Sequence, residues 1–243
     1  MKKKYKFSVA VFIITMFVAL LYAAFTSIVN NVPAMAEIGS MPVIIIDPGH
    51  GGIDGGAVGV SGIVEKDINL AISLMLKDMF EINGFDVIMT RTEDVSIHDD
   101  GVKGVRKQKV SDLKNRLKIV NNQPDAIFIS IHQNKFESSK SKGAQMFFGP
   151  NNSGSEMLAA LIQQNFAASL QPGNNREIKK AGKDLYLMYN AKCPAVLIEC
   201  GFLSNAQDEQ MLVQSEYQSK ISFEIFGSVV QFLEANRATV KSI

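Results

Sequence analysis

Beyond residue 41, short apolar segments alternate with longer segments in which apolar residues recur at helical spacing. Most of the short segments contain β-branched residues and end near turn residues, a pattern typical of buried strands. We expect strands over residues 43–47, 85–90, 126–131, 144–148, 185–189 and 195–199. We expect helices over residues 67–82, 111–121, 155–170 and 219–234. This alternation predicts a single α/β domain, residues 41–236, whose sheet is covered by helices on both faces.

The first two expected helices show which side chains should face the core. In residues 67–82 the inward positions are expected to be Ile68, Ile72, Met75 and Met79. Ser111 is placed to cap the second helix, whose inward positions are expected to be Leu113, Leu117 and Val120. Residues 94–109, which are rich in glycine and charge, are expected to form one long irregular loop.

The N-terminus has the pattern of a targeting segment. Four lysines within the first six residues precede residues 7–29, which carry no charge. That uncharged run is long enough to span about 30 Å of hydrocarbon as a helix. Ala34-Met35-Ala36 then matches the small-x-small pattern of a signal-peptidase site. We expect residues 1–36 to be a signal peptide or a retained membrane anchor, with the domain outside the cytoplasm in either case.

The net charge bears on the kind of partner, and the cysteine content bears on whether a disulfide forms. The formal net charge is +1, and no basic tract follows the leader, which argues against nucleic acid as a partner. The two cysteines, Cys193 and Cys200, bracket an expected strand. A strand rises about 3.3 Å per residue, whereas bridged Cα atoms lie within about 7 Å. We therefore expect two buried free thiols and no disulfide.

Three side chains that can bind a metal ion lie where expected elements end or begin. His50 follows the first strand, His132 follows the third, and Glu65 precedes the first long helix. Clefts in open parallel sheets form beyond the carboxyl ends of the strands, so the three can meet there. Taken singly, each fits an ordinary structural role better. Together they form a typical catalytic zinc set with a fourth position open to water.

Glu199 ends the expected strand 195–199 and should face the same cleft. A carboxylate there can take a proton from water and later protonate a leaving nitrogen. Asn134 and Arg91 are candidate substrate-binding residues, although a local structural role is equally open for them and for Arg116. His98 lies in the expected loop and is interpreted as a solvated histidine.

The glycine-rich loop at residues 49–56 does not indicate a nucleotide site. It contains neither a Walker lysine nor the G-x-G-x-x-G order that cradles phosphates. Its glycines instead allow a sharp turn and leave room for a bulky substrate beside His50.

At these residues the chain resembles the zinc-dependent N-acetylmuramoyl-L-alanine amidases of the Amidase_3 family. The motifs that carry the resemblance are Asp47-Pro48-Gly49-His50-Gly51-Gly52, Glu65-Lys66-Asp67, Thr90-Arg91, Ser130-Ile131-His132-Gln133-Asn134 and Glu199-Cys200-Gly201-Phe202-Leu203-Ser204-Asn205. The resemblance implies a mostly parallel six-stranded sheet, similar to that of zinc carboxypeptidases. It also implies that His50, Glu65 and His132 bind zinc, that Glu199 is catalytic, and that the substrate is peptidoglycan.

The basic stretch at residues 101–107 is longer than in most of the family and is similar to the CwlD subgroup of spore-forming bacteria. This implies a role in spore cortex maturation, where muramic-δ-lactam forms, and in germination, in the forespore or cortex region. Family behaviour further implies weak activity without an activating protein partner. Two other classes stay open on the residues alone: another zinc peptidoglycan peptidase (a carboxypeptidase or endopeptidase), and a non-catalytic wall-binding protein.

Overall fold

The computed structural model describes residue 16 and residues 41–241, with side chains described as far as residue 237. The chain divides into residues 1–41 and a compact unit, residues 42–243, which holds all the elements below. Apart from residue 16, the expected signal peptide or anchor lies outside the described residues. Within the described part of the chain, no helix is both long enough and apolar enough to cross a membrane.

A six-stranded sheet forms the centre of this unit, in the order β2-β1-β3-β6-β4-β5. All neighbouring strands run parallel except β4 and β6, which are antiparallel. The strands are β1 (Ile44–Pro48), β2 (Val87–Met89), β3 (Ile127–Asn134), β4 (Gln145–Phe148), β5 (Lys179–Lys180) and β6 (Ala195–Phe202). This confirms the expected α/β fold with a mostly parallel six-stranded sheet.

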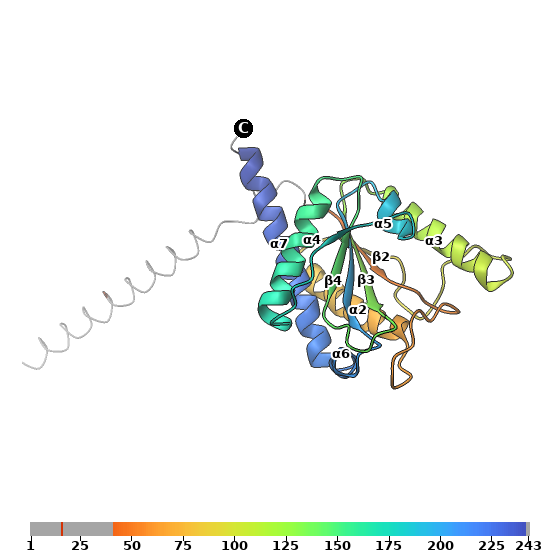
Figure 1. The fold of residues 1–243 in the computed structure, drawn as a ribbon. Helices are drawn as coiled ribbons and strands as arrows, with labels where there is room; N and C mark the ends of the chain where they lie inside the picture. Colours follow the sequence, from red (N-terminus) through yellow and green to blue (C-terminus); the bar gives the residue numbers. More distant parts are fainter. Residues whose placement is uncertain (1–15, 17–40, 242–243) are drawn as a thin grey trace, which may run out of the picture. The chain divides into compact units, whose positions relative to one another are not determined.

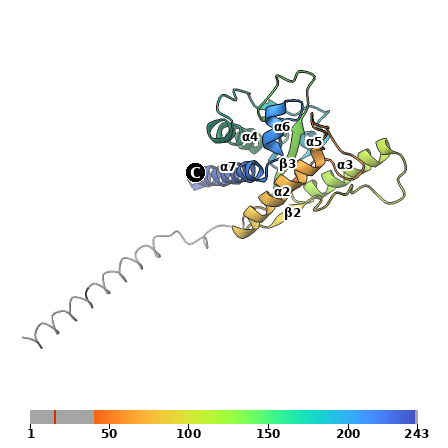
Figure 2. The ribbon, with the colours of Figure 1, turned by 90° about the horizontal axis from the view of Figure 1, so that it is seen from below.

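Helices cover both faces of the sheet (Figures 1 and 2). One face packs against α2 (Glu65–Ile82) and α4 (Gly154–Asn165), and α7 (Ser215–Lys241) packs against both of these helices. The opposite face packs against α3 (Val105–Asn121) and α5 (Tyr186–Asn190). A short π-helix, η2 (Phe166–Leu170), continues α4, and α6 (Ala206–Leu212) follows β6. Burial of apolar side chains between these layers is the main force that holds them together.

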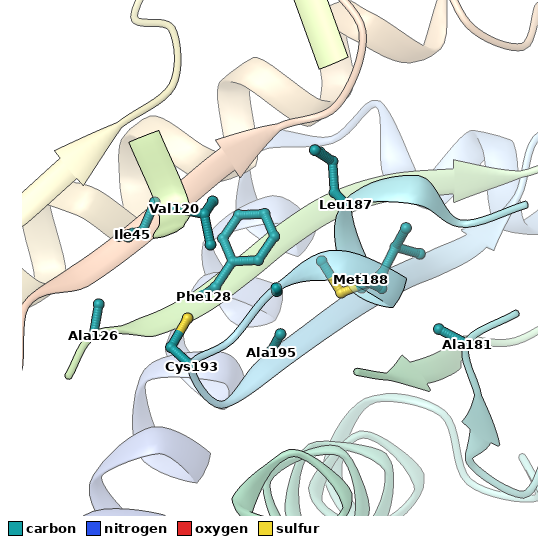
Figure 3. Close-up of a cluster of buried hydrophobic side chains, with 11 residues drawn as sticks. Ile45, Val120, Ala126, Phe128, Ala181, Leu187, Met188, Cys193 and Ala195 are labelled. Atoms are coloured by element: carbon teal, nitrogen blue, oxygen red, sulfur yellow. The ribbon is translucent and has the colours of Figure 1, made fainter. Parts of the chain in front are cut away.

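The core under α3 and α5 shows how strand alternation assigns residues to the two faces (Figure 3). Ile45 of β1, Phe128 of β3 and Ala195 of β6 meet Val120 of α3 and Met188 of α5. Side chains two residues further along a strand lie on the same face. The face under α3 and α5 is therefore also the face of Asp47, Ser130, His132, Leu197 and Glu199.

The inward face of α2 differs from the one expected. Ile68 and Ile72 are buried as expected, but Leu76 and Phe80 complete the buried face in place of Met75 and Met79, which are half-buried. Positions 68, 72, 76 and 80 follow an i, i+4 stripe, and this stripe packs against α7 and the sheet. The helix ends at Ile82, as expected, with Asn83 as its C-cap.

The expected start of α3 is wrong. The helix begins at Val105, so residues 105–107 of the basic stretch expected in a loop form its first turn, and Gly104 rather than Ser111 precedes it. Ser111 lies inside the helix, where its hydroxyl accepts from the Asp99 backbone N–H and donates to the Asp99 carboxylate. Leu113 is exposed, because the buried face of the helix carries Ser111, Asp112, Arg116 and Val120.

Further differences from the expected elements lie in the second half of the chain and at the strand ends. The expected strand at residues 185–189 is wrong, because this segment forms α5, while β5 and α6 have no counterpart among the expected elements. β3 and β6 are longer than expected, so His132 and Glu199 lie within strands rather than after or at the end of one.

Cys193 and Cys200 are free and buried, as expected.

A buried ion pair joins α3 to the end of β1. The Arg116 guanidinium donates from Nη1 to Asp47 Oδ1 at 2.6 Å and from Nε to Asp112 Oδ2 at 2.6 Å. Thr90 and Ser130 donate their hydroxyls to the Asp47 carboxylate as well. Burial by itself would raise the pKa of Asp47, but Arg116 and these hydroxyls lower it to about 2. The carboxylate is thus charged in the core and fully satisfied.

We predict that Arg116→Met lowers the free energy of unfolding by about 3–5 kcal/mol, because it leaves a buried carboxylate unpaired. Urea unfolding at neutral pH measures the change. Arg106→Met on the exposed side of the same helix is the control, and should stay within about 0.5 kcal/mol of wild type. Asp47 has a lowered pKa, so its contribution is complete above its ordinary pKa and is lost as the pH falls toward 2. The gap between wild type and Arg116→Met should therefore narrow on acidification; a gap independent of pH would contradict this assignment.

Candidate metal centre and active site

The three expected metal ligands lie together at the carboxyl edge of the sheet. His50 Nε2 lies 3.2 Å from Glu65 Oε1, and His132 Nδ1 lies 3.0 Å from the same oxygen. One ligand atom from each residue falls within 4.8 Å of the others. Two imidazoles and one carboxylate at this spacing can hold one metal ion.

His50 is positioned by an unusual backbone and by small neighbours. Its φ of 64° is in the left-handed region, which non-glycine residues adopt rarely and mostly where surrounding contacts enforce it. The His50 carbonyl accepts from Arg116 Nη2 at 2.6 Å, which holds this turn against α3. Gly49 and Gly56 leave the space that the site needs. A Cβ at Gly49 would overlap the His132 ring, and one at Gly56 would lie 2.7 Å from His50 Cδ2.

Glu65 reaches the site from the other layer, because it is the first residue of α2. Its Oε2 accepts from the Ala57 backbone N–H, while Oε1 accepts from Asn69 Nδ2 and from the Gln133 backbone N–H. Burial by itself would raise its pKa, but the hydrogen bonds and charges of His132 and His50 hold that pKa well below its usual range. Glu65 is therefore present as a carboxylate, the form that binds metal.

Asp54 contacts the ring nitrogen of His50 that faces away from Glu65. Asp54 Oδ2 lies 3.1 Å from His50 Nδ1, and its Oδ1 lies 2.7 Å from Lys109 Nζ on α3. Burial alone would lower the pKa of His50, but the Asp54 and Glu65 carboxylates raise it to about 9. A carboxylate on the outer nitrogen fixes the tautomer and the ring orientation of a ligating histidine. Asp54 is therefore a positioning residue for His50.

Glu199 stands beside the three ligands without joining them. It is the direct register partner of His132 on the neighbouring strand, so the two side chains share one face of the sheet. Its Oε2 is buried and has no hydrogen-bond partner among the described residues. Burial raises its pKa to about 7. A carboxylate that accepts and releases a proton near neutral pH is suited to general acid–base chemistry.

The other residues singled out from the sequence have different positions. The Arg91 guanidinium is buried and donates to the carbonyls of Pro48, Gly49, Lys66 and Glu93. This geometry gives Arg91 a structural role in the ligand-bearing loop, in place of the expected substrate-binding role. Asn134 is half-buried at the end of β3, so its substrate-binding role stays a prediction.

His98 lies outside the group of metal ligands. It is half-buried rather than freely solvated, with its ring nitrogens against Ser96 Oγ and Gln108 Nε2.

Four supporting residues were not foreseen from the sequence: Asp54, Asn69, Lys109 and Gln133. Two of them carry a local signal. Asn69 lies four residues after Glu65 on one helix, a spacing that brings side chains together. Asp54 follows His50 by four residues within the glycine-rich loop, but its contact depends on the turn at His50. Lys109 has no such signal, because its contact exists only once α3 packs beside this loop.

The fold and the site define an α/β protein with a candidate metal centre, and the comparisons give its family. The model of the Amidase_3 family, described as N-acetylmuramoyl-L-alanine amidase, matches residues 44–231. The germination-specific N-acetylmuramoyl-L-alanine amidase of Bacillus subtilis (strain 168) is 37% identical over 190 residues, which cover 78% of this chain and 79% of that protein. The chain belongs to the N-acetylmuramoyl-L-alanine amidase family.

Two solved structures agree with this family. The CwlD amidase from Clostridioides difficile, solved in complex with the GerS lipoprotein, has a TM-score of 0.77 and 41% identity, covering 80% of this chain and 100% of that one. The catalytic domain of CwlV, an N-acetylmuramoyl-L-alanine amidase from Bacillus (Paenibacillus) polymyxa var. colistinus, has a TM-score of 0.67 and 30% identity. It covers 80% of this chain and 99% of that one. The chain is a peptidoglycan amidase that groups with CwlD-like members.

We predict that His50→Ala and His132→Ala each abolish tight binding of one Zn²⁺ per chain, because each removes one of only three protein ligands. Elemental analysis after dialysis measures the metal content. His98→Ala is the matched control and should keep its zinc, since His98 lies outside the group. A full complement of zinc in either ligand variant would show that the ion binds elsewhere.

We also predict that Asp54→Asn weakens Zn²⁺ binding by about tenfold without unfolding the domain, because an amide supports the His50 ring less strongly than a carboxylate. Competition with a chelator gives the dissociation constant. Lys109→Met should produce a smaller loss through Asp54, whereas Lys107→Met, exposed on the same helix, should produce none. Unchanged zinc affinity in Asp54→Asn would remove its positioning role.

Proposed function

We propose that this chain is a zinc-dependent amidase that hydrolyses the bond between N-acetylmuramic acid and the L-alanine of the peptidoglycan stem peptide. The observation that carries the proposal is the pairing of the His50–Glu65–His132 group with Glu199. The ligands offer the donors that zinc prefers, and the one adjacent carboxylate on the same sheet face has an unpartnered, buried oxygen. A structural carboxylate at that position would be hydrogen-bonded.

The residues divide the chemistry between them. His50, Glu65 and His132 would hold Zn²⁺, which when bound polarises the scissile carbonyl and lowers the pKa of water. Glu199 accepts a proton from the attacking water while the water oxygen forms a bond to the carbonyl carbon. The C–N bond then breaks, and Glu199 transfers that proton to the nitrogen of L-alanine. The products are the lactyl carboxylate on the glycan and a stem peptide with a free amine.

Asp54 and Asn69 support these steps without touching the substrate. Asp54 holds the outer nitrogen of the His50 ring, and Asn69 bridges Glu65 Oε1 and the Gly49 carbonyl. The ligands are thus oriented before any ion binds, which lowers the entropic cost of assembling the site.

The cellular role we propose follows from the relatives. One relative is a germination-specific amidase, so we place this chain in spore cortex maturation, where muramic-δ-lactam forms, and in germination. Peptidoglycan lies outside the cytoplasmic membrane, which agrees with residues 1–36 as a signal peptide or retained anchor and residues 41–236 as the catalytic domain. Because the CwlD structure contains the GerS lipoprotein, we further propose a protein partner that activates this enzyme.

We predict that Glu199→Gln lowers the rate of stem-peptide release by about 10²- to 10⁴-fold, because the amide cannot accept a proton from water near neutral pH. The variant should keep its zinc and its fold, since Gln has nearly the shape of Glu. Mass analysis of digested, defined muropeptides measures both the rate and the bond that is cut. Glu65→Gln is the matched control: it should lose zinc, because a ligand and not a base has changed.

Two outcomes would count against the proposal. Release within tenfold of wild type by zinc-loaded Glu199→Gln would show that Glu199 is not the base. Cleavage within the stem peptide, with the muramoyl bond left intact, would assign the site to a peptidase.

A further inference from the structure

A groove of about 970 Å³ opens along the β4–β5 side of the domain. Its walls come from the segment before β4, the segment between η2 and β5, and the start of α6. The residues that matter here are Gln145, which lies in its floor, and four cationic side chains: Lys140, Lys142, Arg176 and Lys179. His50, Glu65, His132 and Glu199 do not line this groove, so it is distinct from the candidate metal centre.

The groove begins next to the catalytic carboxylate. Gln145 is the register partner of Glu199 on the neighbouring strand, as Glu199 is of His132. Directly paired residues in a sheet place their side chains on the same face. The row His132, Glu199, Gln145 therefore runs across β3, β6 and β4, from the metal ligands into the groove. Lys179 on β5 pairs with Phe147, which lies two residues after Gln145 on β4 and therefore on the same face of the sheet. The Lys179 ammonium lies 5.9 Å from the centre of the Phe147 ring.

The groove carries a net positive charge, because its four cationic side chains outnumber the two acidic residues of its lining, Glu177 and Asp208. None of its four cations takes part in an ion pair among the described residues. The Arg176 guanidinium is held 4.7 Å from the centre of the Phe202 ring, and its Nε donates to the Lys142 carbonyl. Of the two acidic residues in the lining, Asp208 is buried and accepts from the backbone N–H groups of Gly143 and Phe202.

The direction of the reaction indicates which half of the substrate enters this groove. Glu199 lies on the β4 side of His132, and it is the residue that delivers a proton to the leaving nitrogen. That nitrogen must then lie on the Glu199 side of the scissile carbon, and the peptide attached to it extends further in the same direction, over Gln145. A stem peptide carries several free carboxylates, which unpaired lysines and an arginine in a concave surface attract.

We propose that this groove is the binding site for the stem peptide, and that Lys142 and Lys179 recognise its carboxylates. The inference rests on the proposed function, since the direction of binding follows from the role of Glu199. The glycan is left to the opposite side of the metal centre, toward β1 and the His50 loop.

The test is the binding of a free stem peptide, L-Ala-γ-D-Glu-diaminopimelate, to the zinc-loaded full domain by NMR titration. Lys142→Gln combined with Lys179→Gln should weaken binding by roughly fivefold or more, and the effect should shrink at high salt because both side chains are exposed. Lys180→Gln is the matched control, since Lys180 is the neighbouring exposed lysine on β5 and does not line the groove. The same peptide with its carboxylates amidated should bind wild type and double variant equally weakly.

Each result decides the inference. The inference is supported if only the charged peptide binds and its affinity depends on the two lysines. It is overturned if the charged peptide does not bind, or if the amidated peptide binds wild type as tightly as the charged one. An equal loss of affinity in Lys180→Gln also overturns it. Hydrolysis of intact muropeptides by wild type, measured in parallel, tests the proposed function separately. If peptide binding depends on the lysines but muropeptides are not hydrolysed, the proposed reaction is wrong and the peptide site stands. If muropeptides are hydrolysed but peptide binding does not depend on the lysines, the peptide site is wrong and the proposed reaction stands.

Discussion

The buried contact between Asp47 and Arg116 is the constraint on which the site depends. Arg116 donates to the Asp47 carboxylate and also to the carbonyls of Pro48 and His50, so a single guanidinium joins the end of β1, the following turn and α3. An unpaired charge at this depth would be strongly unfavourable, which means that the two residues must be placed together. The turn that places His50 in a left-handed conformation is held by the same group. The position of His50 thus depends on the buried ion pair between Asp47 and Arg116.

Sheet geometry then sets the order of functions across the cleft. Because β1, β3 and β6 are parallel neighbours, their carboxyl ends bring His50, His132 and Glu199 to one edge. Glu65 completes the group from the first turn of α2, and its acidic side chain is also favourable at a helix N-terminus. Beyond Glu199 the reversed strand β4 carries Gln145, and the cationic groove follows. The candidate ligand His132, the carboxylate Glu199 and Gln145 at the groove are therefore successive positions along one row.

Helix α3 couples stability to the site through an inner face that is more polar than apolar. Asp112 and Arg116 face the core, and Lys109, one turn earlier, contacts Asp54 behind His50. The basic stretch before residue 109 lengthens this helix at its N-terminal end. Through Lys109 and Asp54, α3 is in this way connected to the orientation of the His50 ring.

The sequence by itself determined the α/β class and most strands, because hydrophobic period is a local property. Strand-end chemistry also indicated which residues come together at the sheet edge, namely His50, Glu65 and His132 with Glu199 beside them. Predictions from the local pattern were wrong where tertiary packing favoured a different structure. Tyr186–Asn190 is apolar enough for a strand yet forms a helix over the Phe128 core, and α3 buries arginine and aspartate where leucine was expected. Only the tertiary structure decided the contacts of Arg91, Asp54, Lys109 and Gln145. Their partners lie on other elements or depend on a strained turn, and no local pattern encodes a contact that exists only after packing.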